Sequence, residues 1–279
     1  MRESHINAPL IGSLVFSFKH LQSPWRFFSA MMNIPTHIKL RGEKEIQIFL
    51  HHRQDFWRIR NLMNQGWKIL QANKNLVYVK KGDLTICGKF EHLGVLYEPL
   101  EKFYQVFDYK NKTVLDVGGY IGYSAVLFSK WGAKKIIIYE AQKNLASLIR
   151  KNLHINNVNG EVYELAVSDK DGDIELSYTE LGTTTVGLYG DKKCRVKSKS
   201  ISKILVEHSI DIAKFDCEGC EYSLLSVPCD ILRRVPKYVI EYHRGFEPLK
   251  KKFEECGYCV KHLWKLNSQI GGFKAEVKV

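Results

Sequence analysis

Acidic residues and one histidine follow two apolar segments in the second half of the chain. Asp216 and Glu218 come directly after one segment, and Glu241 and His243 close the next. Because the carboxyl ends of neighbouring parallel strands meet at one edge of a sheet, we expect these four side chains, together with Glu221, to converge there. A histidine with an ordinary pKa of about 6.5 suits removal of a proton from a hydroxyl, so His243 is the leading candidate for a general base.

Two other interpretations of this group stay open. His243 could be hydrogen-bonded to Glu241 or Tyr242 without a catalytic role. The carboxylates could also hold a divalent cation that binds the oxygen atoms of an acceptor. The adopted prediction has no metal, and assigns the catalytic chemistry to the side chains of Asp216, Glu218, Glu241 and His243.

A glycine-containing turn joins the apolar segment Thr113–Val117 to the helix-like segment Ala125–Lys130. Gly118, Gly119 and Gly122 allow backbone conformations and close approaches that are closed to other residues. A strand, glycine turn and helix place backbone N–H groups at a sheet edge, where a nucleotide-like ligand docks. The turn alone is a moderate signal, because glycine pairs also occur in ordinary tight turns.

A second apolar segment, Lys135–Tyr139, stops at Glu140. An acidic residue that ends the second strand, about 20 residues after such a turn, binds ribose hydroxyls in dinucleotide folds. The alternative is a carboxylate that caps the next helix. The turn and Glu140 together predict a nucleoside-binding site more strongly than either feature alone.

The elements that must position these residues alternate between strand-like and helix-like segments from Thr113 onward. This alternation predicts an α/β fold with a mostly parallel sheet covered on both faces and closed by an antiparallel pair. The expected strands are Thr113–Val117, Lys135–Tyr139, Gly160–Leu165, Ile210–Phe215 and Tyr238–His243, with helices at Ala125–Lys130, Leu145–His154 and Glu247–Glu255. An inserted hairpin is expected to pair Ile174–Tyr178 with Cys194–Ser198 around Thr183–Thr185, and the closing strands are Tyr258–Trp264 and Phe273–Val279 around Gly271 and Gly272.

Residues 1–108 are predicted to form an α+β extension, and residues 109–279 the main domain. Alternation over His37–Leu40 and Glu45–Phe49 predicts a hairpin, and helical spacing predicts a helix over Asp55–Gln65. The remaining expectations for this region are short strands at Trp67–Gln71, Leu76–Val79 and Leu84–Cys87, and a helix over Pro99–Phe107.

The composition is that of a folded, basic protein of 279 residues, 45% hydrophobic, with a formal net charge of +12. The charge favours an acidic partner such as nucleic acid, a phosphorylated substrate or an anionic membrane surface, but its spread along the chain is typical of a solvated basic surface. The best apolar run, Leu10–Phe18, is too short to span a membrane and is a poor signal peptide, so a cytoplasmic location is expected. The segment His20–Met32 could lie on a membrane surface, although packing against the main domain is favoured.

Seven cysteines include two Cys-x-x-Cys pairs, Cys217 with Cys220 and Cys256 with Cys259. The predicted topology separates the pairs by a strand length, roughly 17–20 Å. Thiolates on one zinc each lie about 2.3 Å from the metal, so a shared zinc site is not expected. Free cysteines in a reducing compartment are the default, with a local disulfide as the alternative in a hyperthermophile.

The order of these motifs resembles the FkbM-like family of S-adenosylmethionine-dependent methyltransferases. The resemblance covers roughly residues 83–260. It rests on Asp116–Gly122, Glu140, Lys214–Glu221, a helix with Leu148, Asn152 and Asn156, the turn Ala166–Asp169 with Gly172, and Glu241 with His243. It implies a Rossmann-like class I methyltransferase sheet, S-adenosylmethionine as methyl donor and, usually, transfer to a hydroxyl oxygen.

Under this resemblance, the donor is expected to lie along the glycine turn and the neighbouring strand ends. We assign Asp116 to ordering the turn, Glu140 to the ribose hydroxyls, and Ser168 or Asp169 to adenine, although the last two could equally form a simple turn. The expected donor-binding residues are Asp116, Gly118, Gly119, Tyr120, Gly122, Glu140, Ala141, Ser168, Asp169 and Asp216. The family usually has alanine and asparagine where this chain has Gly119 and Tyr120, a Glu-Pro pair where it has Glu140 and Ala141, and an apolar and a small residue at Cys217 and Cys220.

The expected acceptor is a hydroxyl on a sugar, a lipid-linked compound or another small molecule. The positive charge makes an RNA methyltransferase the first alternative. Amino-group methylases of bases usually carry an Asn/Asp-Pro-Pro-Tyr-like turn after the fourth strand, and Asp216-Cys-Glu-Gly is not one. A non-catalytic module that binds S-adenosylmethionine is the second alternative.

Overall fold

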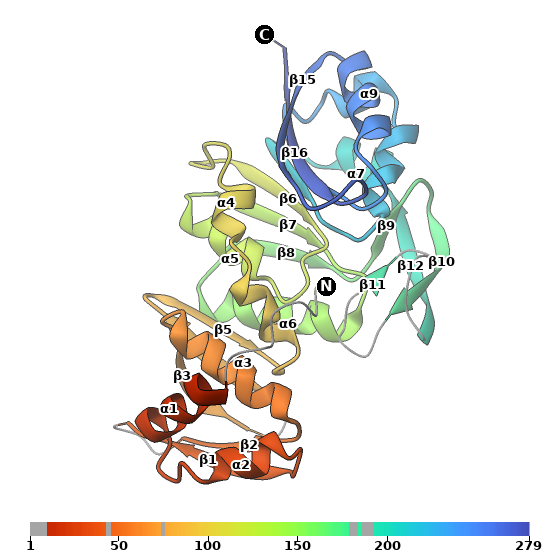
Figure 1. Cartoon of the computed structure of the whole chain (residues 1–279). Helices are drawn as coiled ribbons and strands as arrows, with labels where there is room; N and C mark the ends of the chain where they lie inside the picture. The colour runs from red at the N-terminus through yellow and green to blue at the C-terminus, as the bar shows by residue number, and fades with distance from the viewer. Residues whose placement is uncertain (1–9, 43–45, 74–75, 179–183, 186–191, 279) are drawn as a thin grey trace. The chain divides into compact units, whose positions relative to one another are not determined.

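The chain divides into two compact units, Met1–Glu98 and Pro99–Val279. The computed structural model in Figure 1 describes residues 10–42, 46–73, 76–178, 184–185 and 192–278. The boundary predicted at residue 108 falls inside the second unit, and the assignment of two separate domains stays a prediction.

The first unit combines helices with two small antiparallel sheets, and it confirms the predicted hairpin and the three short strands. The cap of its longest helix explains why that helix begins at Arg53, before the predicted Asp55. Asp55 Oδ2 accepts hydrogen bonds from the backbone N–H groups of His51 and His52, at 3.0 and 3.2 Å, and these bonds satisfy donors that a helix start leaves free. The elements are α1 (Leu10–His20), α2 (Arg26–Met31), β1 (Thr36–Leu40), β2 (Ile46–Leu50), α3 (Arg53–Asn64), β3 (Lys68–Ala72), β4 (Val77–Lys81), β5 (Leu84–Gly88) and the 3-10 helix η1 (His92–Tyr97).

Within the described residues, no helix combines the length and the apolar composition needed to cross a membrane.

The second unit is built on a seven-stranded sheet in the order β15-β16-β14-β13-β6-β7-β8. Its strands are β6 (Thr113–Val117), β7 (Lys135–Tyr139), β8 (Gly160–Tyr163), β13 (Ile212–Phe215), β14 (Lys237–Tyr242), β15 (Tyr258–Lys265) and β16 (Gly271–Val277). β6 pairs in parallel with both β7 and β13, and β13 pairs in parallel with β14. β16 runs antiparallel to β14 and to β15, so the predicted antiparallel closure is confirmed.

Gly271 and Gly272 lie inside β16, and the prediction that they form the closing turn is wrong. The turn comes just before them, where Asn267 Oδ1 accepts hydrogen bonds at 2.8 Å from the backbone N–H groups of Gln269 and Ile270. Glycine is needed in the strand because a Cβ on Gly271 would lie 2.3 Å from the Tyr242 hydroxyl oxygen. The pair therefore marks close packing against neighbouring side chains.

Helices cover the sheet on both faces. The helices that follow the first two strands, α5 (Tyr123–Lys130) and α6 (Lys143–Ile155), contact β6, β7 and β8. Alternate residues of the strands, such as Leu115 and Phe215, belong to a core cluster on the other face. That cluster includes side chains of α7 (Ile201–Glu207), α8 (Cys229–Leu232) and α9 (Glu247–Glu255). Figure 1 shows α9 beside β15 and β16. The remaining helices are α4 (Leu100–Tyr104), shorter than predicted, and the 3-10 helix η2 (Cys220–Ser226).

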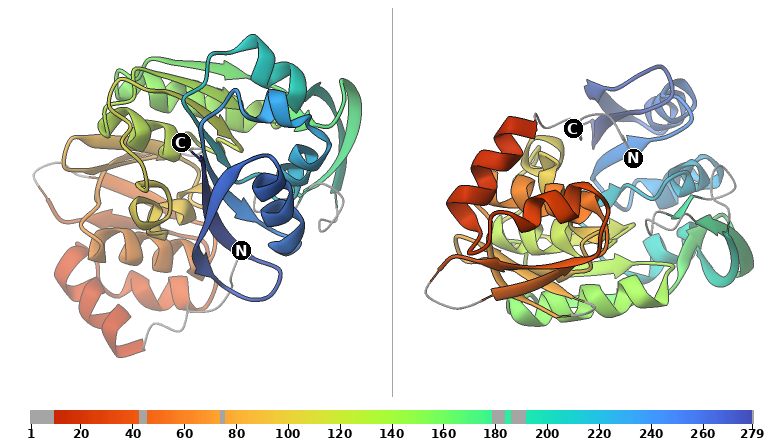
Figure 2. Two further views of the ribbon diagram at one scale, coloured as in Figure 1. Left: turned by 90° about the horizontal axis from the view of Figure 1, so that it is seen from above. Right: turned by 60° about the horizontal axis from the view of Figure 1, so that its bottom comes forward.

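The inserted hairpin is confirmed as β10 (Gly172–Tyr178) paired antiparallel with β12 (Lys192–Ser200). Both views of Figure 2 show this green and teal ribbon apart from the seven-stranded sheet. β11 (Thr184–Thr185) joins it, while Thr183 lies outside the described residues. β9 (Ala166–Ser168) pairs in parallel with β12, so the predicted third strand ends early at Tyr163 and the chain changes sheets.

The expectation of free cysteines is wrong for four of the seven. Cys217 is bonded to Cys220, and Cys256 is bonded to Cys229 rather than to the nearby Cys259. The second bond links α8 to the end of α9. Disulfides persist in oxidising compartments and in hyperthermophiles, so the cytoplasmic location stays a prediction.

Candidate active site

The glycine turn after β6 is shaped by contacts that other residues would disrupt. Gly118 has a φ of +81°, and a Cβ there would lie 2.0 Å from the backbone oxygen of Asp216. A Cβ on Gly119 would lie 2.4 Å from Ile138 Cγ2, so this chain has no room for the alanine that is usual in the family. Gly122 has a φ of +83° and begins α5. The turn therefore approaches the ends of both β7 and β13.

Glu140 is linked to the glycine turn by a direct hydrogen bond. The backbone N–H of Tyr120 donates to Glu140 Oε2, and that of Gln142 donates to Oε1, both at 2.9 Å. Tyr120 adopts a left-handed backbone, with a φ of +52°. Burial raises the pKa of Glu140 to about 7, although the two backbone hydrogen bonds lower it. Glu140 thus contacts both the glycine turn and the backbone N–H just before α6, the second contact being the helix cap left open as the alternative. The donor-binding roles of Glu140 and Ala141 stay predictions.

Asp116 lies beneath the turn, where it is fully buried. Ser124 in α5 donates to Asp116 Oδ2 at 2.6 Å, and Lys214 Nζ lies 2.9 Å from Oδ1. These contacts join β6, α5 and β13 beneath the turn, and the role of Asp116 in ordering the turn stays a prediction.

Lys214 is a buried part of the site whose role sequence reasoning missed. Its Nζ also donates to the backbone oxygen of Gly118 at 2.9 Å and lies 3.8 Å from Asp216 Oδ2. Burial opposes its charge, but the nearby Asp116 and Asp216 outweigh this effect and raise the pKa of Lys214. A lysine in the otherwise apolar strand β13 was the available signal.

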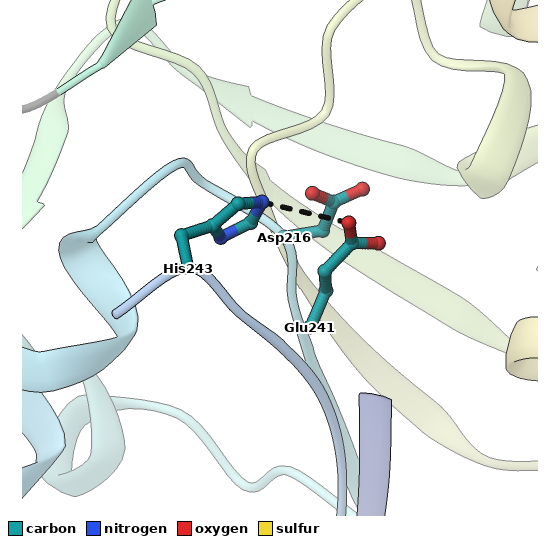
Figure 3. A group of neighbouring side chains, drawn as sticks. All are labelled: Asp216, Glu241 and His243. Carbon is teal, nitrogen blue, oxygen red and sulfur yellow. Dashed lines mark ion pairs between the residues drawn. The ribbon is translucent and has the colours of Figure 1, made fainter. Parts of the chain in front are cut away.

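Asp216, Glu241 and His243 come together at the carboxyl ends of β13 and β14, as predicted. One ligand atom from each lies within 4.8 Å of the others, and Figure 3 shows the imidazole and both carboxylates turned toward one another. Tyr104, a residue that the sequence did not indicate, donates its hydroxyl to Asp216 Oδ2 at 2.8 Å. Asp216 thus contacts the glycine turn through its backbone, and its side chain lies beside Glu241 and His243.

His243 is held by Glu221, which is completely buried. Glu221 Oε1 lies 3.0 Å from His243 Nδ1 and accepts the backbone N–H of His243 at 2.9 Å. Burial of the ring opposes protonation, but hydrogen bonds to Glu221 and Glu241 and the charges of Glu221 and Glu218 outweigh it and raise the pKa of His243 to about 11. An imidazole that is already protonated at neutral pH cannot accept a proton, so this electrostatic balance favours a different base. The role of His243 as the base stays a prediction.

For Glu241, burial and a neighbouring negative charge favour the neutral, protonated carboxyl group. Its Oε1 lies 3.5 Å from His243 Nε2. Burial, followed by the negative charge of Asp216, raises the pKa of Glu241 to about 7, against the lowering effect of His243. Glu218 lies 3.8 Å from His243 Nε2, and burial raises its pKa as well. The site therefore contains a carboxylate that titrates near neutral pH beside an imidazolium.

Two carboxylates and one imidazole at this spacing match the ligand set of a divalent cation, the alternative left open by the sequence. In the protonation state described above, the imidazolium supplies the positive charge that such a cation would supply.

Ser168 and Asp169 lie outside the seven-stranded sheet. Ser168 Oγ donates to the backbone oxygen of Lys170 at 2.6 Å, and the Asp169 backbone oxygen accepts a hydrogen bond from Ser200 Oγ at 3.3 Å. These contacts form the turn that was the alternative to adenine binding, and the adenine role stays a prediction.

The strand order, the glycine turn and the acidic group at the sheet edge define a Rossmann-like class I methyltransferase that uses S-adenosylmethionine as methyl donor. The family model described as the methyltransferase FkbM domain matches residues 116–260, and the chain belongs to this family.

Comparisons with individual proteins show only distant similarity. No curated protein sequence matches the chain. An O-methyltransferase from Bacillus cereus, solved with SAH, is 13% identical over 65% of this chain and 82% of its own, with a TM-score of 0.42. A SAM-dependent methyltransferase from Agrobacterium tumefaciens is 13% identical over 87% and 88% of the two chains, with a TM-score of 0.42. A ribosomal protein L11 methylase from Lactobacillus delbrueckii subsp. bulgaricus is 13% identical over 64% and 76%, with a TM-score of 0.40.

Proposed function

We propose that this protein transfers the methyl group of S-adenosylmethionine to a hydroxyl oxygen of a sugar, lipid-linked compound or other small molecule, with Glu241 as the general base. The observation that carries the proposal is the place of Glu241 at the carboxyl end of β14, where its Oε1 lies 3.5 Å from His243 Nε2 and close to Asp216. Burial and the charge of Asp216 raise the pKa of Glu241 there to about 7. A base whose pKa is near the working pH is ionised in a large fraction of molecules and still binds a proton strongly enough to drive its transfer.

The reaction balances with the groups present. The acceptor oxygen attacks the methyl carbon, the sulfur–carbon bond breaks, and the donor leaves as the neutral thioether S-adenosylhomocysteine. The hydroxyl proton passes to Glu241. His243, as an imidazolium locked by Glu221, keeps Glu241 oriented and balances its charge, while Asp216 raises the affinity of Glu241 for the proton.

Most of the rate enhancement is assigned to positioning. Holding two reactants in line accounts for about 7–11 kcal/mol of a barrier, and a general base adds a factor of about 10²–10⁴ in rate. The donor is assigned to the turn formed by Gly118, Gly119, Tyr120 and Gly122, with Glu140 on the ribose hydroxyls. Both oxygens of Glu140 already accept a backbone N–H, and each keeps a second lone pair for a donor hydroxyl.

Methyl transfer to model hydroxyl acceptors, compared between the wild type and Glu241→Gln, tests the proposal. We expect the substitution to lower kcat by about 10²–10⁴ while donor affinity stays within about twofold. Equal turnover would remove Glu241 from the mechanism. Loss of wild-type activity on adding a chelator, with recovery on adding a divalent cation, would favour the metal alternative instead.

A further inference from the structure

The outer face of α1 and α2 carries large apolar side chains in contact with one another. Phe18, Trp25 and Phe28 are 46%, 67% and 46% exposed. The rings of Phe18 and Trp25 lie 5.5 Å apart edge to face, and those of Trp25 and Phe28 stack at 6.2 Å. Val15, Met32 and Ile34 are also at least half exposed. We call Val15, Phe18, Trp25, Phe28, Met32 and Ile34 the aromatic patch.

The aromatic patch is additional to the apolar face that builds the core of this unit. Phe16 and Phe27, on the same two helices, are buried, and both rings pack against Phe56 of α3. A helix in a folded unit normally buries one apolar stripe and exposes polar residues on its other side. Here both sides are apolar, and contiguous exposed apolar surface marks an interaction site.

The charged side chains of the segment that carries the aromatic patch, residues 10–42, have a single sign. Lys19, Arg26 and Arg41 are exposed, and the sequence has no aspartate or glutamate from Leu10 to Gly42. An aromatic and aliphatic surface whose own chain segment carries basic but no acidic side chains is complementary to an anionic lipid surface, where rings enter the interface and lysine and arginine contact the headgroups.

We propose that the aromatic patch binds the protein to an anionic membrane surface without spanning it. This inference does not depend on the proposed methyltransferase reaction. It takes up the membrane surface that the sequence left open as the alternative to packing against the main domain.

The charge pattern favours a lipid surface over the other occupants. A symmetric contact with a second copy would bring the same patch from each chain together, and the basic side chains of one copy would then lie near those of the other with no acidic residue of this segment to pair with them. RNA would use the rings for base stacking, but it offers little to the aliphatic side chains of Val15, Met32 and Ile34.

Sedimentation of the full chain with vesicles tests the proposal. We expect binding to vesicles of phosphatidylcholine with phosphatidylglycerol, and much weaker binding to phosphatidylcholine alone. The double variant Trp25→Ser/Phe28→Ser should reduce the bound-to-free ratio about tenfold or more, and Lys19→Glu should reduce it about tenfold. Leu70→Ser, which removes a 44% exposed leucine from β3 of the same unit, is the matched control and should bind as the wild type does.

Hydrogen exchange on the unmodified protein gives a second readout that does not depend on how the variants fold. Vesicles should slow exchange in residues 15–34 and leave that of α9 unchanged. The proposal is overturned if the wild type does not bind anionic vesicles, if the double variant binds them as well as the wild type does, or if vesicles do not change hydrogen exchange in residues 15–34. If the wild type does not bind vesicles but forms a dimer or an RNA complex that the double variant cannot form, the aromatic patch binds a second copy or RNA, and the membrane proposal is wrong.

Discussion

Lys214 Nζ lies 2.9 Å from Asp116 Oδ1, with both side chains almost completely buried beneath the glycine turn. Breaking a buried ion pair from one side leaves an uncompensated charge, at a cost of about 3–5 kcal/mol. Lys214→Met should therefore lower the free energy of unfolding by about this amount, measured by urea denaturation. The double variant Asp116→Asn/Lys214→Met should recover part of the loss, and a double variant less stable than the sum of the single changes would contradict the pairing.

Glu140 provides a test of the donor site. Glu140→Ala removes the acceptor of the Tyr120 N–H and the group assigned to the ribose, so calorimetry should find S-adenosylhomocysteine bound at least about tenfold more weakly. Glu140→Gln keeps one acceptor oxygen and should bind with intermediate affinity. Unchanged affinity in Glu140→Ala would remove this residue from the donor site.

The pKa of Glu241 predicts the pH dependence of turnover. The base must be ionised, so kcat should fall about tenfold for each pH unit below a midpoint near 7 and level off above it. Because the pKa of His243 is about 11, its imidazolium should persist across this range and add no second step. Rates are to be measured with saturating donor from pH 5 to pH 9, about the range in which most proteins stay folded. A flat profile would contradict the assignment.

The bond between Cys229 and Cys256 closes a loop of 27 residues. Cross-links over loops of this size stabilise the folded state by about 3–4 kcal/mol. Cys229→Ala/Cys256→Ala should lower the unfolding free energy by that amount. A reductant should destabilise the wild type more than the variant, which retains only the bond between Cys217 and Cys220. Mass spectrometry that finds both thiols free in the native protein would contradict this pairing.

Local patterns predicted the central strands well, because buried parallel strands have continuous apolar sequences. β6 and β7 begin and end where Thr113–Val117 and Lys135–Tyr139 were expected. The third strand was harder to predict, because β9 leaves the main sheet to pair with β12, about 30 residues further along the chain. That exchange of partners depends on a contact that neither segment reveals by itself.

The candidate site was predicted in position but not in protonation state. Asp216, Glu241 and His243 meet as expected, because strand ends of a parallel sheet share one edge. The protonation state of His243 depends on its contact with Glu221. The predicted topology placed Glu221 at this edge as well, but no role was assigned to it. Burial of Glu221 and the geometry of that contact are tertiary properties, as is the choice of Cys229 as partner of Cys256.

Transfer of labelled methyl groups into fractionated cell extract tests the central claim most directly. S-adenosylmethionine with a radioactive methyl group is incubated with the protein and with RNA, glycan, lipid and small-metabolite fractions, in parallel with Glu241→Gln. We predict label in a glycan, lipid or small-metabolite fraction, held as an alkali-stable methyl ether and nearly absent with the variant. Label only in RNA, or equal label with Glu241→Gln, would contradict hydroxyl methylation with Glu241 as its base.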